Sequence, residues 1–193
     1  GSLTAVRTND TSGGVGGLIT WTFTASDAAT NQLAAGQFVH ETYTVTLNDG
    51  KGGVVTRDVV VTIAGANDDA IITVSAGDSD IGAVTEDTHS ATETATGTLS
   101  FSDVDLTDTH TITAAPVGTT LGTLTATKIA DTANGTGGSL EWTYSVANSA
   151  IQHLAAGQQV DEKFTISIFD GTSTVTKEVT VTVAGANDDA IIT

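Results

Sequence analysis

The chain has 193 residues and a formal net charge of −17 at pH 7, with 23 acidic residues against six Lys and Arg, and it contains no cysteine. This negative charge excludes nucleic acid and anionic membrane surfaces as expected partners, because both attract positively charged proteins. The missing cysteine excludes disulfides and thiolate metal sites, and since the sequence has no apolar run of about 18 residues, no direct membrane insertion is expected.

Apolar and polar residues alternate with a period of two through most of the chain, which is typical of half-buried strands. Val and Thr dominate these segments, and clusters of Gly, Asn and Asp interrupt them roughly every 8–12 residues, as in a β-sandwich. No long amphipathic helix is evident, and Ala150–Gly157 is expected to form a short helical turn or a corner between sheets. The expected strands lie near residues 2–7, 18–25, 39–48, 54–64, 70–76, 91–102, 109–115, 121–128, 140–147, 160–169 and 174–184.

One ten-residue string, AGANDDAIIT, occurs twice, at Ala64–Thr73 and at Ala184–Thr193. The match extends beyond it: Gly1–Gly17 aligns with Gly122–Gly138, and Trp21 aligns with Trp142, at an offset of 121 that becomes 120 after the Asp-Gly at residues 170–171. The sequence therefore predicts a repeating unit of about 120 residues.

This repeat predicts an all-β chain of tandem antiparallel β-sandwich units. Residues 1–65 form a partial repeat, the C-terminal half of a unit; residues 66–185 form a complete repeat; residues 186–193 begin the next. Half a sandwich would expose its core. Strands from 66–115 could complete it, which would make a split or permuted domain, or strands of another chain could do so.

Between residues 58 and 127 the sequence has eleven carboxylates and no Lys or Arg. Converging carboxylates repel one another unless a cation lies among them. Ca²⁺ fits this need, because it takes about six to eight oxygen ligands and tolerates irregular geometry. The sharpest motif is Asp103 and Asp105, since an extended Asp-x-Asp places both carboxylates on one side, about 7 Å apart. The sequence therefore predicts Ca²⁺ as the bound cofactor.

The centre of the ten-residue string supplies Asn67, Asp68 and Asp69, which are further candidate Ca²⁺ ligands at the handover between repeats. The alternative is that such residues are solvated turn formers. That alternative stays equally open for Asp78, Asp80 and Asp108, and the pair Glu86-Asp87 is another candidate.

Catalysis has little support in the sequence. None of the four histidines falls in a zinc-binding spacing such as HExxH, no Ser lies in a GxSxG motif, and no Gly-rich phosphate loop opens a helix. His110 is expected to be an exposed strand residue, and Trp21 and Trp142 are expected to pack in the core. The chain is therefore not expected to be an enzyme.

Five ordered motifs carry a family resemblance: GTLSFSDVD at residues 97–105, then LEWTYSV, QHLAAGQ, FTISIFDG and VTVTVAGAND. Together they resemble the VCBS repeat, a β-sandwich module related to cadherin-like and Ig-like domains of large RTX-type bacterial adhesins. The resemblance implies a structural extender that is stiffened by Ca²⁺ at inter-repeat junctions and projects a distal ligand-binding region for attachment or biofilm formation. It also implies type I secretion to the cell surface, with neighbouring repeats of the same polypeptide as partners; a glycan- or protein-binding module is the alternative.

The same resemblance implies roles for individual residues. Asn67, Asp68 and Asp69 resemble linker ligands, and Asp103 and Asp105 resemble the Asp-x-Asp of the following module. The remaining implied metal ligands are Glu86 with Asn187, Asp188 and Asp189 at the next junction, and Glu41 and Glu162 as the acidic residue entering the penultimate strand.

Overall fold

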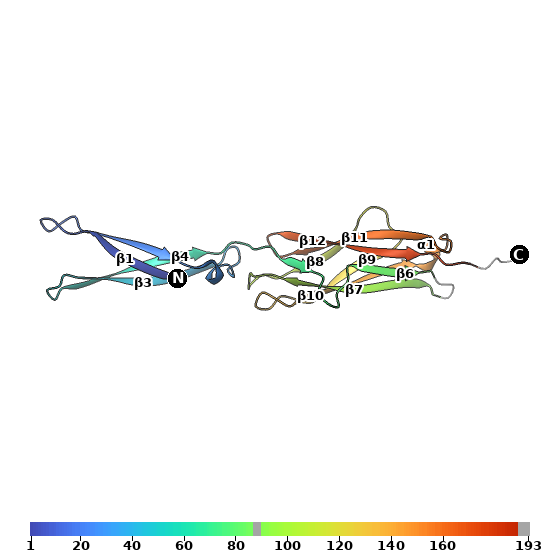
Figure 1. The fold of residues 1–193 in the computed structure, drawn as a ribbon, viewed down its shortest axis with the longest axis horizontal. Helices are drawn as coiled ribbons and strands as arrows, with labels where there is room; N and C mark the ends of the chain where they lie inside the picture. The colour runs from blue at the N-terminus through green and yellow to red at the C-terminus, as the bar shows by residue number, and fades with distance from the viewer. Residues whose placement is uncertain (87–89, 189–193) are drawn as a thin grey trace. The chain divides into compact units, whose positions relative to one another are not determined.

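The computed structural model describes residues 1–86 and 90–188, and it divides the chain into two compact units, Gly1–Asn67 and Asp68–Thr193. Strands dominate both units and nearly all of them pair antiparallel, so the predicted all-β fold is confirmed (Figure 1). No helix in the described part of the chain is long and apolar enough to cross a membrane.

The second unit is a sandwich of two four-stranded sheets. In the first sheet the order is β5-β7-β10-β9, and in the second it is β6-β12-β11-β8. Antiparallel pairing holds throughout except between β6 and β12, which run parallel. The strands are β5 (Ile71–Thr73), β6 (Ile81–Thr85), β7 (Thr92–Ser102), β8 (Thr111–Pro116), β9 (Thr123–Ala130), β10 (Gly138–Ala147), β11 (Gln159–Phe169) and β12 (Thr174–Ala184), with the short helix α1 (Asn148–Ile151) after β10.

Alternate residues of the long strands point into the space between the two sheets, as the period of two requires. On β10 and β11 every second residue over most of the strand is buried. The largest of these side chains is Trp142, which is 0% exposed and donates its indole N–H to the carbonyl of Ser79 at 2.8 Å. Glycines make room for its ring: a Cβ on Gly97 would lie 2.5 Å from it, and one on Gly82 would lie 2.7 Å from it.

The first unit consists of two β-hairpins. The strands β1 (Ser2–Asn9) and β2 (Leu18–Thr24) form one two-stranded sheet, and β3 (Phe38–Asn48) and β4 (Val54–Ala64) form the other, with the short 3₁₀ helix Asp27–Ala29 between the hairpins. By the sequence alignment these hairpins are equivalent to β9–β10 and β11–β12 of the second unit. Nothing equivalent to β5, β6, β7 and β8 pairs with them among the described residues.

The strands that lie between residues 66 and 115 pair with the second unit, not with residues 1–65. The intrachain split domain considered from the sequence is therefore not the arrangement seen. Within the described structure the first unit therefore lacks strands that would cover its apolar face, and the aligned tryptophans show the consequence. Trp21 is 46% exposed, whereas Trp142 is 0% exposed. The prediction that Trp21 packs in the core is wrong for this reason, while that for Trp142 is confirmed.

Most expected strands appear within a few residues of their expected bounds, and α1 lies where a short helical turn or corner was expected. Two differences stand out. The strand expected near 70–76 is only the three residues of β5, and β6 was not expected at all. With five residues and an internal Gly82, β6 has too little alternation to reveal a strand, and its parallel partner β12 lies about 100 residues away in sequence.

Candidate metal centre

The Asp-x-Asp motif follows the end of β7, where the chain leaves the sheet and turns. Asp103 is buried; its backbone N–H donates to the carbonyl of Gly135 at 3.2 Å, and its Oδ1 accepts the backbone N–H of Asp105 at 2.9 Å. This local hydrogen bond bends the motif out of the extended form, so the two carboxylates approach one end of the sandwich.

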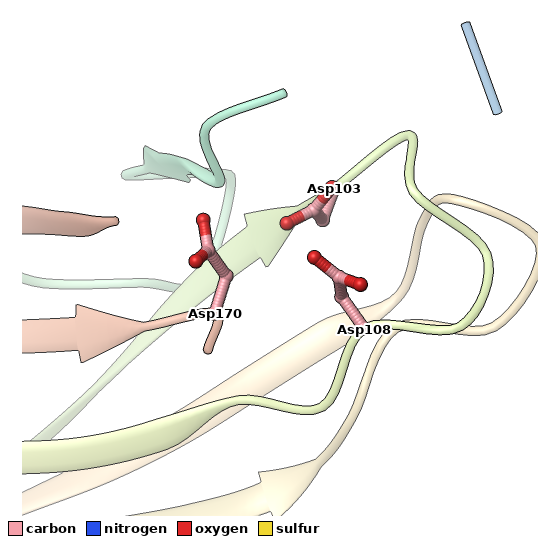
Figure 2. Close-up of side chains that lie close together, drawn as sticks. All are labelled: Asp103, Asp108 and Asp170. Atoms are coloured by element: carbon pink, nitrogen blue, oxygen red, sulfur yellow. The ribbon is translucent and has the colours of Figure 1, made fainter. Parts of the chain in front are cut away.

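Three carboxylates from distant parts of the chain meet at that end. Asp103 follows β7, Asp108 lies five residues later in the same loop, and Asp170 occupies the turn between β11 and β12. One oxygen of each lies within 4.8 Å of the others, and Figure 2 shows the three side chains pointing toward one another. Together with the neighbouring Asp105, these three residues form a group that we call the acidic cluster.

Asp105 is the fourth member and the most deeply buried, at 0% exposed. Its Oδ2 accepts the backbone N–H of Asp68 at 2.8 Å, but its Oδ1 is buried without a hydrogen-bond partner in the described structure. Close by in the same unit, the hydroxyl of Ser173 lies between two carboxylates, 2.6 Å from Asp69 Oδ1 and 2.7 Å from Asp170 Oδ2, and can donate its one hydrogen to either. A buried carboxylate oxygen without a donor is costly, so this site calls for a positive partner.

The electrostatics of the acidic cluster disfavour negative charge on two of its carboxyl groups. Burial raises the pKa of Asp105, and the negative charges of Asp103, Asp68 and Asp170 raise it further. Burial likewise raises the pKa of Asp108, with added repulsion from its neighbours in the cluster. In both groups the charged form is the one that the fold disfavours.

His110 lies next to the acidic cluster, and its predicted place as an exposed strand residue is wrong. The residue is buried in the loop before β8; its Nε2 lies 3.0 Å from Asp103 Oδ2, and its Nδ1 lies 2.6 Å from Asp131 Oδ1. Lys128 joins this network by donating its ammonium to Asp131 Oδ2 at 2.6 Å and to the carbonyl of His110 at 2.7 Å. The imidazole thus holds the carboxylate of Asp103 in its orientation through Oδ2, as outer-shell partners do for metal ligands.

Replacing Asp131 by Asn is expected to destabilise the second unit by about 1–2 kcal/mol at pH 7, after allowance for partial solvent screening. Hydrogen bonds from Lys128 and His110 lower the pKa of Asp131 to about 2 despite its burial. A lowered carboxyl pKa stabilises the fold above the unfolded value of 3.8, and this contribution declines as the pH falls toward 2. The difference between the two proteins should therefore shrink between pH 4 and pH 2 in urea unfolding.

The matched control is Asp10→Asn in the first unit. Asp10 aligns with Asp131, but its ion pair with Arg7 is exposed, so its loss should cost less than about 0.5 kcal/mol. Equal losses at both positions, or a loss at Asp131 that does not change with pH, would contradict the structural role given to Asp131.

The predicted ligands Glu86, Asn187 and Asp188 lie at the other end of the second unit. Glu86 follows β6, and its Oε2 accepts the backbone N–H of Ala186 at 2.9 Å while its Oε1 is buried without a hydrogen-bond partner among described residues. It lies beside the end of β12, opposite the β11–β12 turn that carries Asp170, so it does not join the acidic cluster. Asn187 and Asp188 are exposed near Glu86, and Asp189 lies outside the described residues.

Glu162 is also distant from the acidic cluster. It is buried on β11, eight residues before Asp170, which in an extended strand is about 26 Å. Its carboxylate accepts the backbone N–H groups of Leu121 and Gly122 and the hydroxyl of Tyr144. Burial and the hydrogen bond to Glu162 raise the pKa of Tyr144. Through these hydrogen bonds the carboxylate of Glu162 links β11 to β10 and to the segment before β9.

Glu41 repeats this arrangement in the first unit. It accepts the hydroxyl of Tyr43, and the amino group of Gly1 lies 3.0 Å from its Oε1. The hydrogen bond from Tyr43 and the Gly1 amino group lower the pKa of Glu41. Asn67 is the last residue of the first unit. The structure thus brings together Asp103 and Asp105 from the predicted set, with Asp68 and Asp69 close by.

Sequence reasoning missed Asp170 and the role of His110, and it left Asp108 undecided. Asp170 was visible only as part of a repeated Asp-Gly turn, equivalent to Asp49-Gly50. No local signal in the sequence places this turn beside Asp103, because the two residues follow strands of different sheets and meet only through the packing of those sheets.

No protein-family model and no curated protein matches this sequence. Among solved structures, the sialic acid binding region of a Streptococcus sanguinis adhesin is 15% identical, with 75% of this chain and 37% of that chain covered at a TM-score of 0.38. An endo-fucoidan hydrolase of glycoside hydrolase family 107 is 18% identical, with 95% and 24% covered at a TM-score of 0.31. Both scores lie below 0.5, so neither likeness bears on the function of this chain.

Proposed function

We propose that this chain is a non-catalytic β-sandwich extender of a repetitive adhesin on a bacterial surface, and that Ca²⁺ stabilises the end of its sandwich. The observation that carries the proposal is the acidic cluster, in which the carboxylates of Asp103, Asp108 and Asp170 converge and the neighbouring Asp105 Oδ1 is buried without a donor. The sequence repeat supports the proposal, because tandem copies of one unit suit a spacer.

The donor chemistry fits Ca²⁺ better than other metals. The three converging side chains offer oxygen only, and the nearest imidazole, His110, already contacts Asp103 and Asp131. Hard oxygen donors select Ca²⁺ or Mg²⁺ over the softer transition metals, and Ca²⁺ accepts the irregular spacing of a loop more readily than Mg²⁺ does. Asp103, Asp108 and Asp170 would hold the ion, and Asp105 would lie close to its charge. A bound Ca²⁺ would offset the repulsion within the cluster.

The resemblance to VCBS and cadherin-like repeats supplies the biological setting of the proposal. By that resemblance the chain would lie outside the cell after type I secretion, with neighbouring repeats of the same polypeptide as its partners. The negative charge agrees with a protein that meets Ca²⁺ in an extracellular medium.

Isothermal titration calorimetry on the metal-stripped chain tests the proposal. We expect Ca²⁺ to bind, and we expect Mg²⁺ at the same concentration to bind more weakly. In the Asp103→Asn variant the site associated with the acidic cluster should be lost, while Asp161→Asn, an exposed position on β11, should leave it unchanged. No heat from Ca²⁺, or equal binding by the Asp103→Asn variant, would exclude the proposed site.

The alternative is a module that binds glycan. One feature favours it: a hollow of about 730 Å³ in the first unit, lined by polar residues such as Arg7, Asp10 and Asp49, lies within the size range of ligand sites. A glycan array probed with the full chain separates the two functions. Binding that persists in EDTA would support the alternative, and an absence of binding with and without Ca²⁺ is what the extender proposal predicts.

A further inference from the structure

The first unit carries the apolar face of a sandwich without the strands that cover it. In the second unit β7 pairs with β10, β6 with β12 and β8 with β11. The equivalent edges of β2, β4 and β3 pair with no described strand. Only Ala34 is a buried hydrophobic residue in this unit, and Leu47 is 46% exposed where its equivalent, Ile168, is 0% exposed.

Every core position of β10, β11 and β12 has an apolar equivalent in these hairpins. Trp21 takes the place of Trp142, and the hairpins already approach each other as their equivalents do: Phe23 and Tyr43 lie 6.0 Å apart between ring centroids, against 5.8 Å for Tyr144 and Phe164. The remaining aligned pairs are Ile19 with Leu140, Ala25 with Val146, Val45 with Ile166, Val59 with Val179, Val61 with Val181, and Ile63 with Val183. The surface is thus shaped to receive the same kind of strands that complete the second unit.

Polar groups also indicate that strands like those that cover the second unit would fit the first unit. In the second unit Lys177 pairs with Asp80 at 2.7 Å, and Asp80 directly precedes β6. Arg57 is the equivalent of Lys177, and it makes no ion pair within the described first unit. The covering segment of the second unit, residues 68–121, contains ten carboxylates and no Lys or Arg, so a segment of its composition offers Arg57 an acidic partner.

The hollow of the first unit lies where that segment places a loop in the second. Arg7 and Asp10 line the hollow. Their equivalents Lys128 and Asp131 bind the loop that carries His110. Glu41 likewise holds the Gly1 nitrogen as Glu162 holds the nitrogen of Gly122, and Glu162 also accepts the N–H of Leu121 from the covering segment.

We propose that the first unit is an acceptor surface for a covering segment: a four-stranded, acidic stretch of polypeptide without Lys or Arg, of the chemistry of residues 68–121. The segment adds strands to three open edges, buries Trp21 and fills the hollow with a loop. The mode of recognition is strand addition, in which backbone hydrogen bonds supply affinity and the facing side chains supply specificity. This inference does not depend on Ca²⁺.

The test joins a second copy of residues 68–121 ahead of Gly1 in the full chain, so that the Leu121–Gly1 bond reproduces the natural Leu121–Gly122 bond. Trp21 and Trp142 are the only tryptophans, and only Trp21 is exposed. Acrylamide quenching of the unmodified chain should therefore show one accessible and one protected population. In the extended chain the accessible population should be lost and the emission should shift to shorter wavelength.

A matched control carries Gly97→Leu only in the added copy, since a Cβ at this glycine would overlap the tryptophan ring; here Trp21 should stay accessible. The Arg57→Glu variant of the extended chain should weaken the protection of Trp21. The unfolding transition of residues 68–193, present in every variant, shows that each protein is folded.

Three results would overturn the inference. They are an accessible Trp21 in the extended chain, equal protection by the Gly97→Leu copy, and a dimer of the unmodified chain in which Trp21 is protected. The last result would mean that a second copy, and not a covering segment, occupies the surface; sedimentation velocity detects it.

Discussion

Replacing Asp105 by Asn should reduce the stabilisation by Ca²⁺ while leaving the metal-free chain as stable as before, or more stable. The reason is the direction of the pKa shift. Because the folded protein raises the pKa of Asp105, its charged form at pH 7 destabilises the fold when no cation is present. Asn keeps an oxygen for the N–H of Asp68 and removes the charge. The substitution therefore has opposite signs with and without the metal.

The size of the effect follows from linkage. A ligand that binds only the folded state at 100 times its dissociation constant stabilises that state by about 2.7 kcal/mol. For a unit of this size the gain corresponds to a rise in melting temperature on the order of 10 °C. Differential scanning calorimetry in Ca²⁺ and in EDTA should show this rise for the unmodified chain and a smaller rise for Asp105→Asn.

Glu141→Gln is the control for the change of charge. Glu141 lies exposed on β10, away from the acidic cluster, so the variant should respond to Ca²⁺ as the unmodified chain does. If Asp105→Asn gained as much from Ca²⁺ as Glu141→Gln does, the acidic cluster would not be the site that couples Ca²⁺ to folding.

The second large effect concerns the aligned tryptophans. Trp142→Ala should destabilise the second unit by about 3–5 kcal/mol, because it leaves a cavity in the core and removes the hydrogen bond to Ser79. Trp21→Ala makes the same chemical change in the first unit, where the ring is exposed, so it should cost less than about 1 kcal/mol.

Urea unfolding followed by circular dichroism compares the two variants. Trp142→Phe provides an intermediate case that keeps an aromatic ring and should lose less stability than Trp142→Ala. Similar losses from Trp21→Ala and Trp142→Ala would show that the first unit has a covered core in solution, contrary to the structure.

The parts of the fold that sequence could predict are those with strong local periodicity. The alternation of Val and Thr in β11 and β12 requires a strand whose faces differ, and both strands appear within one residue of their expected bounds. β6 could not be predicted, because it is five residues long and becomes a strand only through its parallel partner β12. Its existence is decided by tertiary pairing rather than by propensity.

The candidate metal site also combines residues that the local sequence predicts with residues that only the tertiary structure brings in. Asp103 and Asp105 could be predicted because their spacing is local, and Asp68 and Asp69 because a repeated string marks them. Asp170 could not, since it meets Asp103 only when the sheet that contains β11 and β12 packs against the sheet that contains β7. His110 was misplaced because alternation suggested an exposed strand position, whereas hydrogen bonds to Asp103 and Asp131 hold it in a buried loop.

The half-covered first unit also lies beyond the reach of sequence alone. The alignment of the two copies indicates that residues 1–65 lack the first strands of the repeat, but it leaves open whether residues 66–115 supply them. Sheet pairing in the structure assigns those strands to the second unit. An exposed set of core residues remains, and a covering segment would account for its pattern of apolar positions, for Arg57 and for the hollow.

The most direct test of the central claim is X-ray diffraction from crystals of the chain grown with Ca²⁺, recorded at a wavelength where calcium scatters anomalously. We predict an anomalous peak about 2.3–2.6 Å from carboxylate oxygens of Asp103, Asp108 and Asp170. An ordered loop with no anomalous peak among these three carboxylates would contradict the claim that the acidic cluster is a Ca²⁺ site.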